Sequence, residues 1–310
     1  MDFLNPGFLG KLSTFRTHFA MPIERDGSDA RAAILRKITL PFILRRLKSD
    51  RRVIRDLPEK QEMKVFCNLT AEQAGLYQSV VDEMFSRLSA GEESIFERKG
   101  LILSALVKLK QITNHPANFL HDESEFGSSR SGKLQRLEEM LQVILDEGDK
   151  ALIFTQFAQL GHLLQPKLTR HFGVNVLYLH GGTTQRQREQ LIDQFQTKKG
   201  PPIFVLSLKA GGLGLNLTEA NHVFHFDRWW NPAVEDQATD RAFRIGQLKN
   251  VQVHKFICVG TVEEKIDRMI DDKKRLADNI INAGEKLITD LSFEQLRDAF
   301  VLSRDAVSEQ

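Results

Sequence analysis

The sequence contains little cysteine and no long apolar run, and these two absences limit the classes of protein to which it can belong. Among 310 residues only Cys67 and Cys258 are cysteines, and they are far apart without the spacing of metal ligands. A disulfide framework is therefore excluded, no metal site is predicted, and a reducing compartment, cytoplasmic or nuclear, is expected. No apolar run reaches the length of about 18 residues that a membrane-spanning helix needs. The start of the chain also lacks the basic and apolar parts of a signal peptide.

The chain also lacks an excess of charge of either sign. Its 43 Lys and Arg residues and 41 Asp and Glu residues give a net charge of +2. Any site for a polyanion must therefore be a local patch rather than the whole surface. Apolar residues make up 41% and charged residues 27%, proportions typical of a soluble globular protein with a full core. One large domain or two modest ones are expected.

A complete ATP-binding site is missing as well. The stretch Gly127 to Lys133 has the GxxxxGK skeleton of a phosphate-binding loop, but Leu134 stands where a Ser or Thr would hold magnesium. The preceding residues 121–126 do not resemble a buried strand, and no acidic cluster of the Walker B type follows an apolar strand. Gly132 and Lys133 are instead expected to begin the helix that follows. The sequence thus lacks the parts that hold ATP and its metal.

Beyond residue 131 the apolar pattern alternates between helix and strand. Strands are predicted at 151–155, 175–179, 203–207, 222–226 and 251–257. Helices are predicted at 133–147, 157–171, 184–196 and 233–244. This alternation indicates right-handed crossovers and a parallel sheet with helices on both faces, so the fold class is α/β. In such sheets ligands bind beyond the carboxyl ends of the strands.

The first part of the chain is helical and basic. Residues 1–40 show short helical patterns, and residues 41–58 form a basic connector whose charges face either solvent or a partner lobe and phosphates. A strand is predicted at 62–69. Four further helices are predicted, two after this strand and two at the end of the chain, at 71–90, 95–113, 263–281 and 292–301.

Glycines and a lysine follow the strand predicted at 203–207. The segment Ser207 to Leu217 contains Lys209, Gly212 and Gly214. Glycines allow backbone N–H groups to approach an anion closely, and the lysine adds a positive charge. The segment therefore predicts an anion-binding loop. The alternative is a tight turn with a lysine in solvent.

Two other strand ends also carry candidate contact residues. His180, which precedes Gly181, is either a polar contact to a ligand or a structural histidine with its partners inside the fold. Trp229 and Trp230 follow the strand at 222–226. Two adjacent indoles cannot both face one core, so one of them contacts nucleic acid or a neighbouring lobe, or simply lies on the surface.

The helix predicted at 233–244 would bring three polar side chains together. Gln237, Arg241 and Arg244 are spaced by four and three residues, so they would project from one face of a helix. Two guanidinium groups aimed together suit a polyanion, because they stay charged and bind phosphate oxygens in a bidentate fork. The alternative is a surface helix in which nearby carboxylates pair with these arginines.

These segments resemble motifs of the Swi/Snf-type DNA translocases, the chromatin-remodelling branch of the superfamily-two helicase-like ATPases. The segment Gln237 to Gln247 is similar to the sixth motif of the family, Lys209 to Leu217 to the fifth, and Leu152 to Phe157 to the fourth. Other segments that resemble family patterns are Pro41 to Arg46, Leu109 to Pro116, Phe226 to Pro232 and Gly260 to Lys265. The resemblance covers nearly the whole chain.

The resemblance implies a RecA-like C-terminal motor lobe at 126–261, with a helical protrusion at 70–125 and a brace helix with a tail at 262–310. Residues 1–40 would be a helical remnant of the first motor lobe, and 41–69 a basic connector. ATP with Mg²⁺ would then bind between this lobe and a first RecA-like lobe that is not in the sequence. That first lobe would hold most of the metal, and the natural start of the protein is left open.

The same resemblance implies a role for each candidate residue. Arg241 and Arg244 would act as arginine fingers on the γ-phosphate, and Gln237 would orient one of them or the attacking water. Loop residues on the nucleotide side would be Gly212, Gly214 and Asn216. Residues that hold DNA phosphates without reading bases would be Gln156, His180, Gly181, Ser207, Lys209 and Trp229.

The resulting hypothesis is the C-terminal lobe of an ATP-dependent translocase on double-stranded DNA, inactive as an ATPase by itself. A DNA-bound protein complex is a further expected partner. A noncatalytic DNA- or protein-binding module is the alternative from a different class. A remodeller that acts on RNA polymerase is a third interpretation.

Overall fold

The computed structural model describes residues 5–24, 28–42, 57–90, 94–121, 125–208, 214–228, 232–276 and 291–307. The chain divides into two compact units, Met1–Asp56 and Leu57–Gln310. Several residues singled out in the sequence lie outside the described part, namely the basic run 45–55 and Lys209, Gly212 and Trp229.

The smaller unit is helical, as the sequence predicts. Its elements are α1 (Leu12–Phe15), the π-helical turn η1 (Arg16–Ala20), α2 (Met21–Glu24), α3 (Asp29–Thr39) and the 3-10 turn η2 (Leu40–Phe42). Ser28 caps α3, because its hydroxyl accepts a hydrogen bond from the Arg31 backbone nitrogen at 3.4 Å. The rings of Phe8 and Phe42 meet edge to face with centroids 4.5 Å apart, which joins the beginning of the unit to its end.

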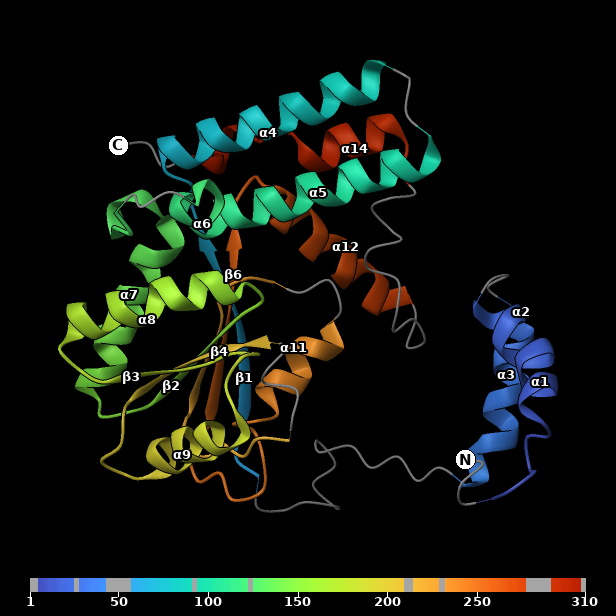
Figure 1. Ribbon diagram of the computed structural model, residues 1–310, viewed down its shortest axis with the longest axis horizontal. Helices are drawn as coiled ribbons and strands as arrows, with labels where there is room; N and C mark the ends of the chain where they lie inside the picture. The colour runs from blue at the N-terminus through green and yellow to red at the C-terminus, as the bar shows by residue number, and fades with distance from the viewer. Residues whose placement is uncertain are drawn as a thin grey trace. The chain divides into compact units, whose positions relative to one another are not determined.

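The larger unit is built on a six-stranded sheet in the order β1-β6-β5-β2-β4-β3, with every neighbouring pair parallel (Figure 1). The strands are β1 (Lys60–Cys67), β2 (Ala151–Thr155), β3 (Val176–Leu179), β4 (Ile203–Ser207), β5 (His222–His225) and β6 (Val251–Cys258). The α/β prediction is confirmed, and each strand lies within two residues of its predicted bounds.

Strand β1 is part of this sheet, although it falls inside the connector predicted at 41–69. It pairs with β6 along its whole length, from Lys60 opposite Val251 to Cys67 opposite Cys258. The compact unit consequently begins at Leu57. The last residues of the segment assigned to the connector are therefore a strand of the sheet.

Helices cover both faces of the sheet. Helices α7 (Gly132–Asp146) and α8 (Ala158–Phe172) pack on one face, and α9 (Gln185–Gln196) and α11 (Pro232–Thr239) on the other. Successive side chains of a strand point to opposite faces. Accordingly, Leu152 and Phe154 of β2 join the core beneath α9 and α11, while Ile153 joins the core beneath α7 and α8.

A second helical layer lies beyond the carboxyl ends of β1 and β6 (Figure 1). It comprises α4 (Ala71–Ala90), α5 (Ile95–Asn114), α6 (Pro116–Leu120), α12 (Val262–Leu276) and α14 (Phe293–Phe300), which share one apolar core. Tyr77 of α4 is fully buried there, and its hydroxyl accepts a hydrogen bond from the Val262 backbone nitrogen at 2.9 Å. The predicted protrusion and the predicted brace helix are therefore packed together.

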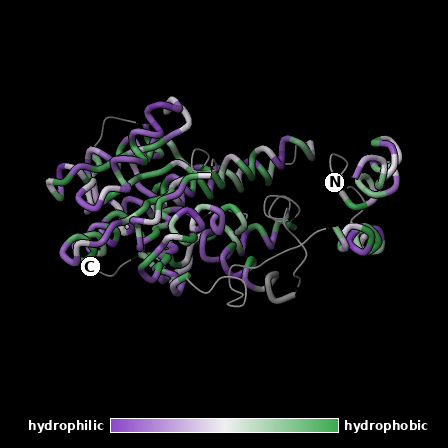
Figure 2. The backbone as a smooth tube through the Cα atoms, turned by 90° about the horizontal axis from the view of Figure 1, so that it is seen from below, coloured by the Kyte–Doolittle hydropathy of each residue, from purple (hydrophilic) through white to green (hydrophobic). Residues whose placement is uncertain are grey.

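Hydrophobic and hydrophilic residues alternate along the helices of both layers, as Figure 2 shows by colour. This alternation is expected when each helix buries one face and exposes the other. Within the described ranges, no helix has the length and apolar character required to cross a membrane.

Candidate nucleotide and DNA site

The segment with Arg241 and Arg244 does not continue helix α11. The helix ends at Thr239 and tight turns follow, in which the Arg241 backbone nitrogen donates to the Ala238 carbonyl at 3.1 Å. The prediction that Gln237, Arg241 and Arg244 share one helical face is therefore wrong. Gln237 is exposed on α11, whereas the two arginines lie in the turns after it.

Tertiary hydrogen bonds explain why the helix stops here. The Arg241 carbonyl accepts from the Leu217 backbone nitrogen at 2.9 Å, across the chain rather than along the helix. The Gln247 side chain donates to the carbonyls of Ala242 at 3.2 Å and Ala220 at 2.7 Å. Backbone acceptors that a longer helix would use are thus satisfied otherwise, the Arg241 carbonyl by Leu217 and the Ala242 carbonyl by the Gln247 side chain.

The turns place both arginines beside the glycine-containing loop. Arg244 is exposed, and its Nη1 atom lies 3.4 Å from the carbonyl oxygens of Gly214 and Leu215. Arg241 is buried, and its Nε atom has no hydrogen-bond partner among the described residues. Burial lowers the pKa of Arg241, and the positive charge of Arg244 lowers it further. Two guanidinium groups therefore lie close enough to repel each other, which favours an anion between or beside them.

Gly214 and Asn216 form the described part of the predicted nucleotide loop. Gly214 has a φ of +63°, in the left-handed region that favours glycine, and both residues are exposed. Leu215 and Leu217, which alternate with them, are buried and anchor the loop in the core beneath α9 and α11. The loop thus exposes its polar backbone next to Arg244.

The predicted DNA residues lie along a different edge of the sheet. Gln156, Ser207 and His180 stand at or just after the carboxyl ends of β2, β4 and β3, which are adjacent strands. Ser207 is only 3% exposed, so it lines this edge from inside. The Nε2 atom of Gln156 is buried and finds no partner in the described part of the chain, which leaves a donor for a ligand.

One ring nitrogen of His180 takes part in a hydrogen bond within the loop. Its Nδ1 atom accepts from the Gly182 backbone nitrogen at 3.2 Å, so Nε2 carries the proton and is a donor. The ring packs near those of His162 and Tyr178, with centroids 4.9 and 5.1 Å away. Gly181 beside it is exposed. This end of β3 therefore presents a fixed imidazole donor next to an accessible backbone.

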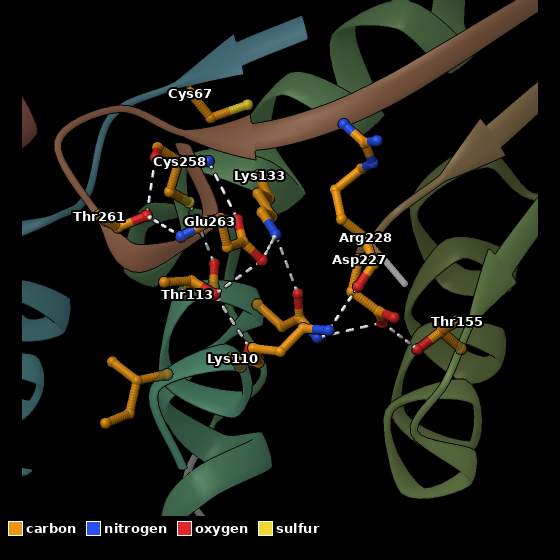
Figure 3. Close-up of polar contacts among 12 residues, drawn as sticks. Cys67, Lys110, Thr113, Lys133, Thr155, Asp227, Arg228, Cys258, Thr261 and Glu263 are labelled. Carbon is orange, nitrogen blue, oxygen red and sulfur yellow. Dashed lines mark hydrogen bonds and ion pairs between the residues drawn. The ribbon is translucent and has the colours of Figure 1, made fainter. Parts of the chain in front are cut away.

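Buried charges, which the sequence analysis did not assign, lie behind this edge (Figure 3). Asp227, directly after β5, is fully buried. Its Oδ2 atom accepts from the Thr155 hydroxyl at 2.5 Å and from the Asn114 amide at 3.2 Å, and its Oδ1 atom accepts from the Gln156 backbone nitrogen at 3.0 Å. Burial raises the pKa of Asp227, and the charge of nearby Lys110 opposes that shift.

Lys133 belongs to the same buried region rather than to a phosphate-binding loop. Helix α7 begins at Gly132, as predicted, and Ser131 caps it. The Lys133 ammonium donates to Glu263 at 2.8 Å and to Asn114 at 3.2 Å, with the side chain fully buried. From sequence alone, a buried polar residue such as Lys133 cannot be told apart from a polar residue on the solvent-exposed face of a helix.

Two family descriptions match the sequence. The Helicase conserved C-terminal domain matches residues 132–246, and the SNF2-related domain matches residues 1–118. The chain is also 47% identical over 306 residues to the putative ATP-dependent helicase/translocase YwqA of Bacillus subtilis (strain 168). That alignment covers 98% of this chain and 33% of the relative, so the chain spans about a third of that relative's length.

Two solved structures from Sulfolobus solfataricus are similar in both sequence and fold. The SWI2/SNF2 ATPase core in complex with dsDNA is 46% identical with a TM-score of 0.72, over 98% of this chain and 63% of that one. The SWI2/SNF2 ATPase C-terminal domain is 42% identical with a TM-score of 0.68, over 79% of this chain and 100% of that one. Because all of that domain is matched at this identity, the chain belongs to the SWI2/SNF2 ATPase family.

Proposed function

We propose that this chain is the C-terminal motor lobe of an ATP-dependent translocase on double-stranded DNA, and that it completes an ATP site shared with a first RecA-like lobe. The observation that carries the proposal is the position of the two arginines. Arg244 lies 3.4 Å from the loop carbonyls, and Arg241 beside it has a buried Nε without a partner among the described residues. A buried donor without an acceptor is costly, and a phosphate oxygen would relieve that cost.

In this proposal Arg241 and Arg244 act as arginine fingers. ATP, with a magnesium ion held mainly by the first lobe, supplies a γ-phosphoryl group whose charge the two guanidiniums neutralise during transfer to water. Gln237, exposed on α11, orients one arginine or the attacking water. Gly214 and Asn216, with Gly212 outside the described residues, line the nucleotide.

The strand ends at β2, β4 and β3 hold duplex DNA by its phosphates. Gln156 contributes its free Nε2 donor, and His180 and Gly181 contribute an imidazole and a backbone N–H group. Ser207 stands at the same edge, and Lys209 and Trp229, which lie outside the described residues, would bind phosphates with it. Contacts of this kind fix the position of the duplex without reading its sequence. The dsDNA bound to the Sulfolobus solfataricus core supports a duplex as the partner here.

Motion between the lobes would convert ATP turnover into movement along DNA. ATP binding draws the two lobes together around the shared site, and hydrolysis releases them. The nucleotide residues lie in the loop at 214–216 and on or just after α11, whereas Gln156, His180 and Ser207 stand at strand ends of the same compact unit. Closure of the ATP site therefore shifts the DNA contacts with it.

The direct test is Arg244→Ala in a two-lobed protein that joins a first RecA-like lobe to this chain. Loss of an arginine finger lowers turnover by about 10³- to 10⁵-fold, or roughly 4–7 kcal/mol of barrier. DNA-stimulated ATP hydrolysis is expected to fall by that factor, with little change in duplex affinity. The matched control is Arg136→Ala, because Arg136 is a half-exposed arginine paired with Glu139 on α7, and turnover should stay unchanged.

The outcome also separates the motor from the alternative function. Unaltered turnover in Arg244→Ala would refute the arginine-finger assignment. If the wild-type two-lobed protein binds duplex DNA but hydrolyses no ATP, the chain is a noncatalytic binding module instead.

A further inference from the structure

The segment Leu109 to Pro116 has no role in the proposed ATP or DNA contacts, yet it buries four polar side chains. Lys110, Thr113, Asn114 and His115 are each at most 2% exposed. Polar groups are rarely buried in this number without hydrogen-bond partners. Their partners therefore indicate what the segment does.

Each of these side chains contacts a different part of the surrounding structure. Lys110 donates its ammonium to the Arg228 carbonyl after β5, and Thr113 donates to Glu263 of α12 at 3.2 Å. His115 pairs with the Gly127 carbonyl at 3.0 Å, and its pKa falls to about 4 because it is buried. The carboxyl end of α5 is thus attached to the sheet by polar contacts.

Asn114 makes the contact that reaches the DNA edge. Its Nδ2 atom donates to Asp227 at 3.2 Å, while its Oδ1 atom accepts from Lys133 at 3.2 Å. The same Asp227 carboxylate holds the Gln156 backbone nitrogen at 3.0 Å through its other oxygen. Figure 3 shows Asp227 between helix α5 and the end of β2, with Thr155 beside it. One carboxylate therefore joins the helical layer to the backbone of a proposed DNA contact.

We propose that Asn114 and Asp227 are positioning residues that fix Gln156 to helix α5, so that the helical layer and the DNA-contacting edge of the sheet move as one body. The proposal rests on the proposed function for the role of Gln156 toward DNA. A purely apolar joint would hold the two layers together but would not fix the Gln156 backbone. Hydrogen bonds are directional, so the two oxygens of Asp227 can set that geometry.

A matched pair of variants on α5 tests this. Asn114→Leu keeps the branched shape of the side chain but removes its bonds to Asp227 and Lys133. Thr113→Val removes one bond to Glu263 and leaves Asp227 untouched. We would measure amide hydrogen exchange of Gln156 in the full chain, using Ile153 in the middle of β2 as the reference for global unfolding. Duplex DNA affinity would be measured by fluorescence anisotropy on the same proteins.

Asn114→Leu is expected to raise the exchange of Gln156 relative to Ile153 by about tenfold and to weaken duplex binding, because the carboxylate loses a donor that holds it in place. Thr113→Val is expected to leave the exchange ratio and the duplex affinity unchanged. Asp227→Asn should give a smaller effect than Asp227→Ala, because the asparagine oxygen still accepts from the Gln156 nitrogen.

Equal exchange ratios in Asn114→Leu and wild type would overturn the proposal. A rise in Thr113→Val as large as that in Asn114→Leu would also overturn it. The positioning of Gln156 and the proposed DNA function can fail separately. If the exchange ratio rises but the wild-type chain does not bind duplex DNA, the positioning of Gln156 by α5 stands and the proposed DNA function is contradicted.

Discussion

The Lys133 ammonium lies 2.8 Å from the Glu263 carboxylate, and the two side chains are only 0% and 1% exposed. The pair joins the first turn of α7 to the first turn of α12, so it fixes the predicted brace helix to the RecA-like core. Burial alone would lower the pKa of Lys133, but Glu263 and the other acidic groups nearby together outweigh that effect and raise it. The lysine therefore stays charged at neutral pH.

Lys133→Met should destabilise the larger unit severely. Removing one partner of a buried ion pair leaves an uncompensated charge, at a cost of about 3–5 kcal/mol. The free energy of unfolding in urea measures this loss. Lys133→Met with Glu263→Gln is expected to recover part of it, since the glutamine carries no charge and its one oxygen can still accept from the Cys258 backbone nitrogen. A double variant no more stable than Lys133→Met would contradict the ion-pair explanation.

Two glycine-to-alanine changes should shift stability in opposite directions. A Cβ atom at Gly132 would lie 2.0 Å from the Asn68 carbonyl oxygen, so Gly132→Ala must move the backbone and is expected to destabilise the protein by more than about 1 kcal/mol. A Cβ atom at Gly75, inside helix α4, meets nothing within 4 Å. Gly75→Ala should stabilise by about 0.5–1 kcal/mol. The melting temperatures of both variants test this prediction. Equal shifts in melting temperature would be inconsistent with this packing.

Stability should fall between about pH 6.5 and pH 4. Burial lowers the pKa of His115, His225 and His254 to about 4 each. Within that window the unfolded chain binds protons that the folded chain does not, so the stability present above pH 6.5 is lost as the pH falls. Near pH 5 the three groups together give a slope on the order of 4 kcal/mol per pH unit. Urea midpoints measured from pH 7 to pH 4.5 test this.

A single variant checks the histidine contribution. His254 stacks on Phe224 with ring centroids 4.6 Å apart, so His254→Phe keeps an aromatic ring there and removes one titrating group. The pH slope of stability should fall by about a third. An unchanged slope would show that other groups govern the acid sensitivity.

The sheet could be predicted from sequence because its strands are buried runs between turn residues. Leu152 to Phe154, for example, is an apolar run that parallel strands with two covered faces require. The end of α11 could not be predicted, because the spacing of Gln237, Arg241 and Arg244 suits a helix. The bond from Leu217 to the Arg241 carbonyl stops that helix, and a contact between distant residues leaves no local signal.

The site was only partly predictable for a related reason. Glycines and arginines at strand ends indicate phosphate chemistry by residue type, and Arg244 does lie beside Gly214. Asp227 and Asn114 gave no comparable signal, since a polar residue in a helix or after a strand usually faces solvent. Only the packing of α5 against the sheet shows that the two side chains meet in the interior.

The most direct measurement is ATP hydrolysis by this chain with and without an added first RecA-like lobe, in the presence of duplex DNA. The chain contains no complete phosphate-binding loop, so no hydrolysis is expected from it alone. Mixing is expected to restore DNA-stimulated hydrolysis, and Arg244→Ala should abolish that restoration. Duplex binding by the chain with no hydrolysis on mixing with an active first lobe would contradict the shared-site account.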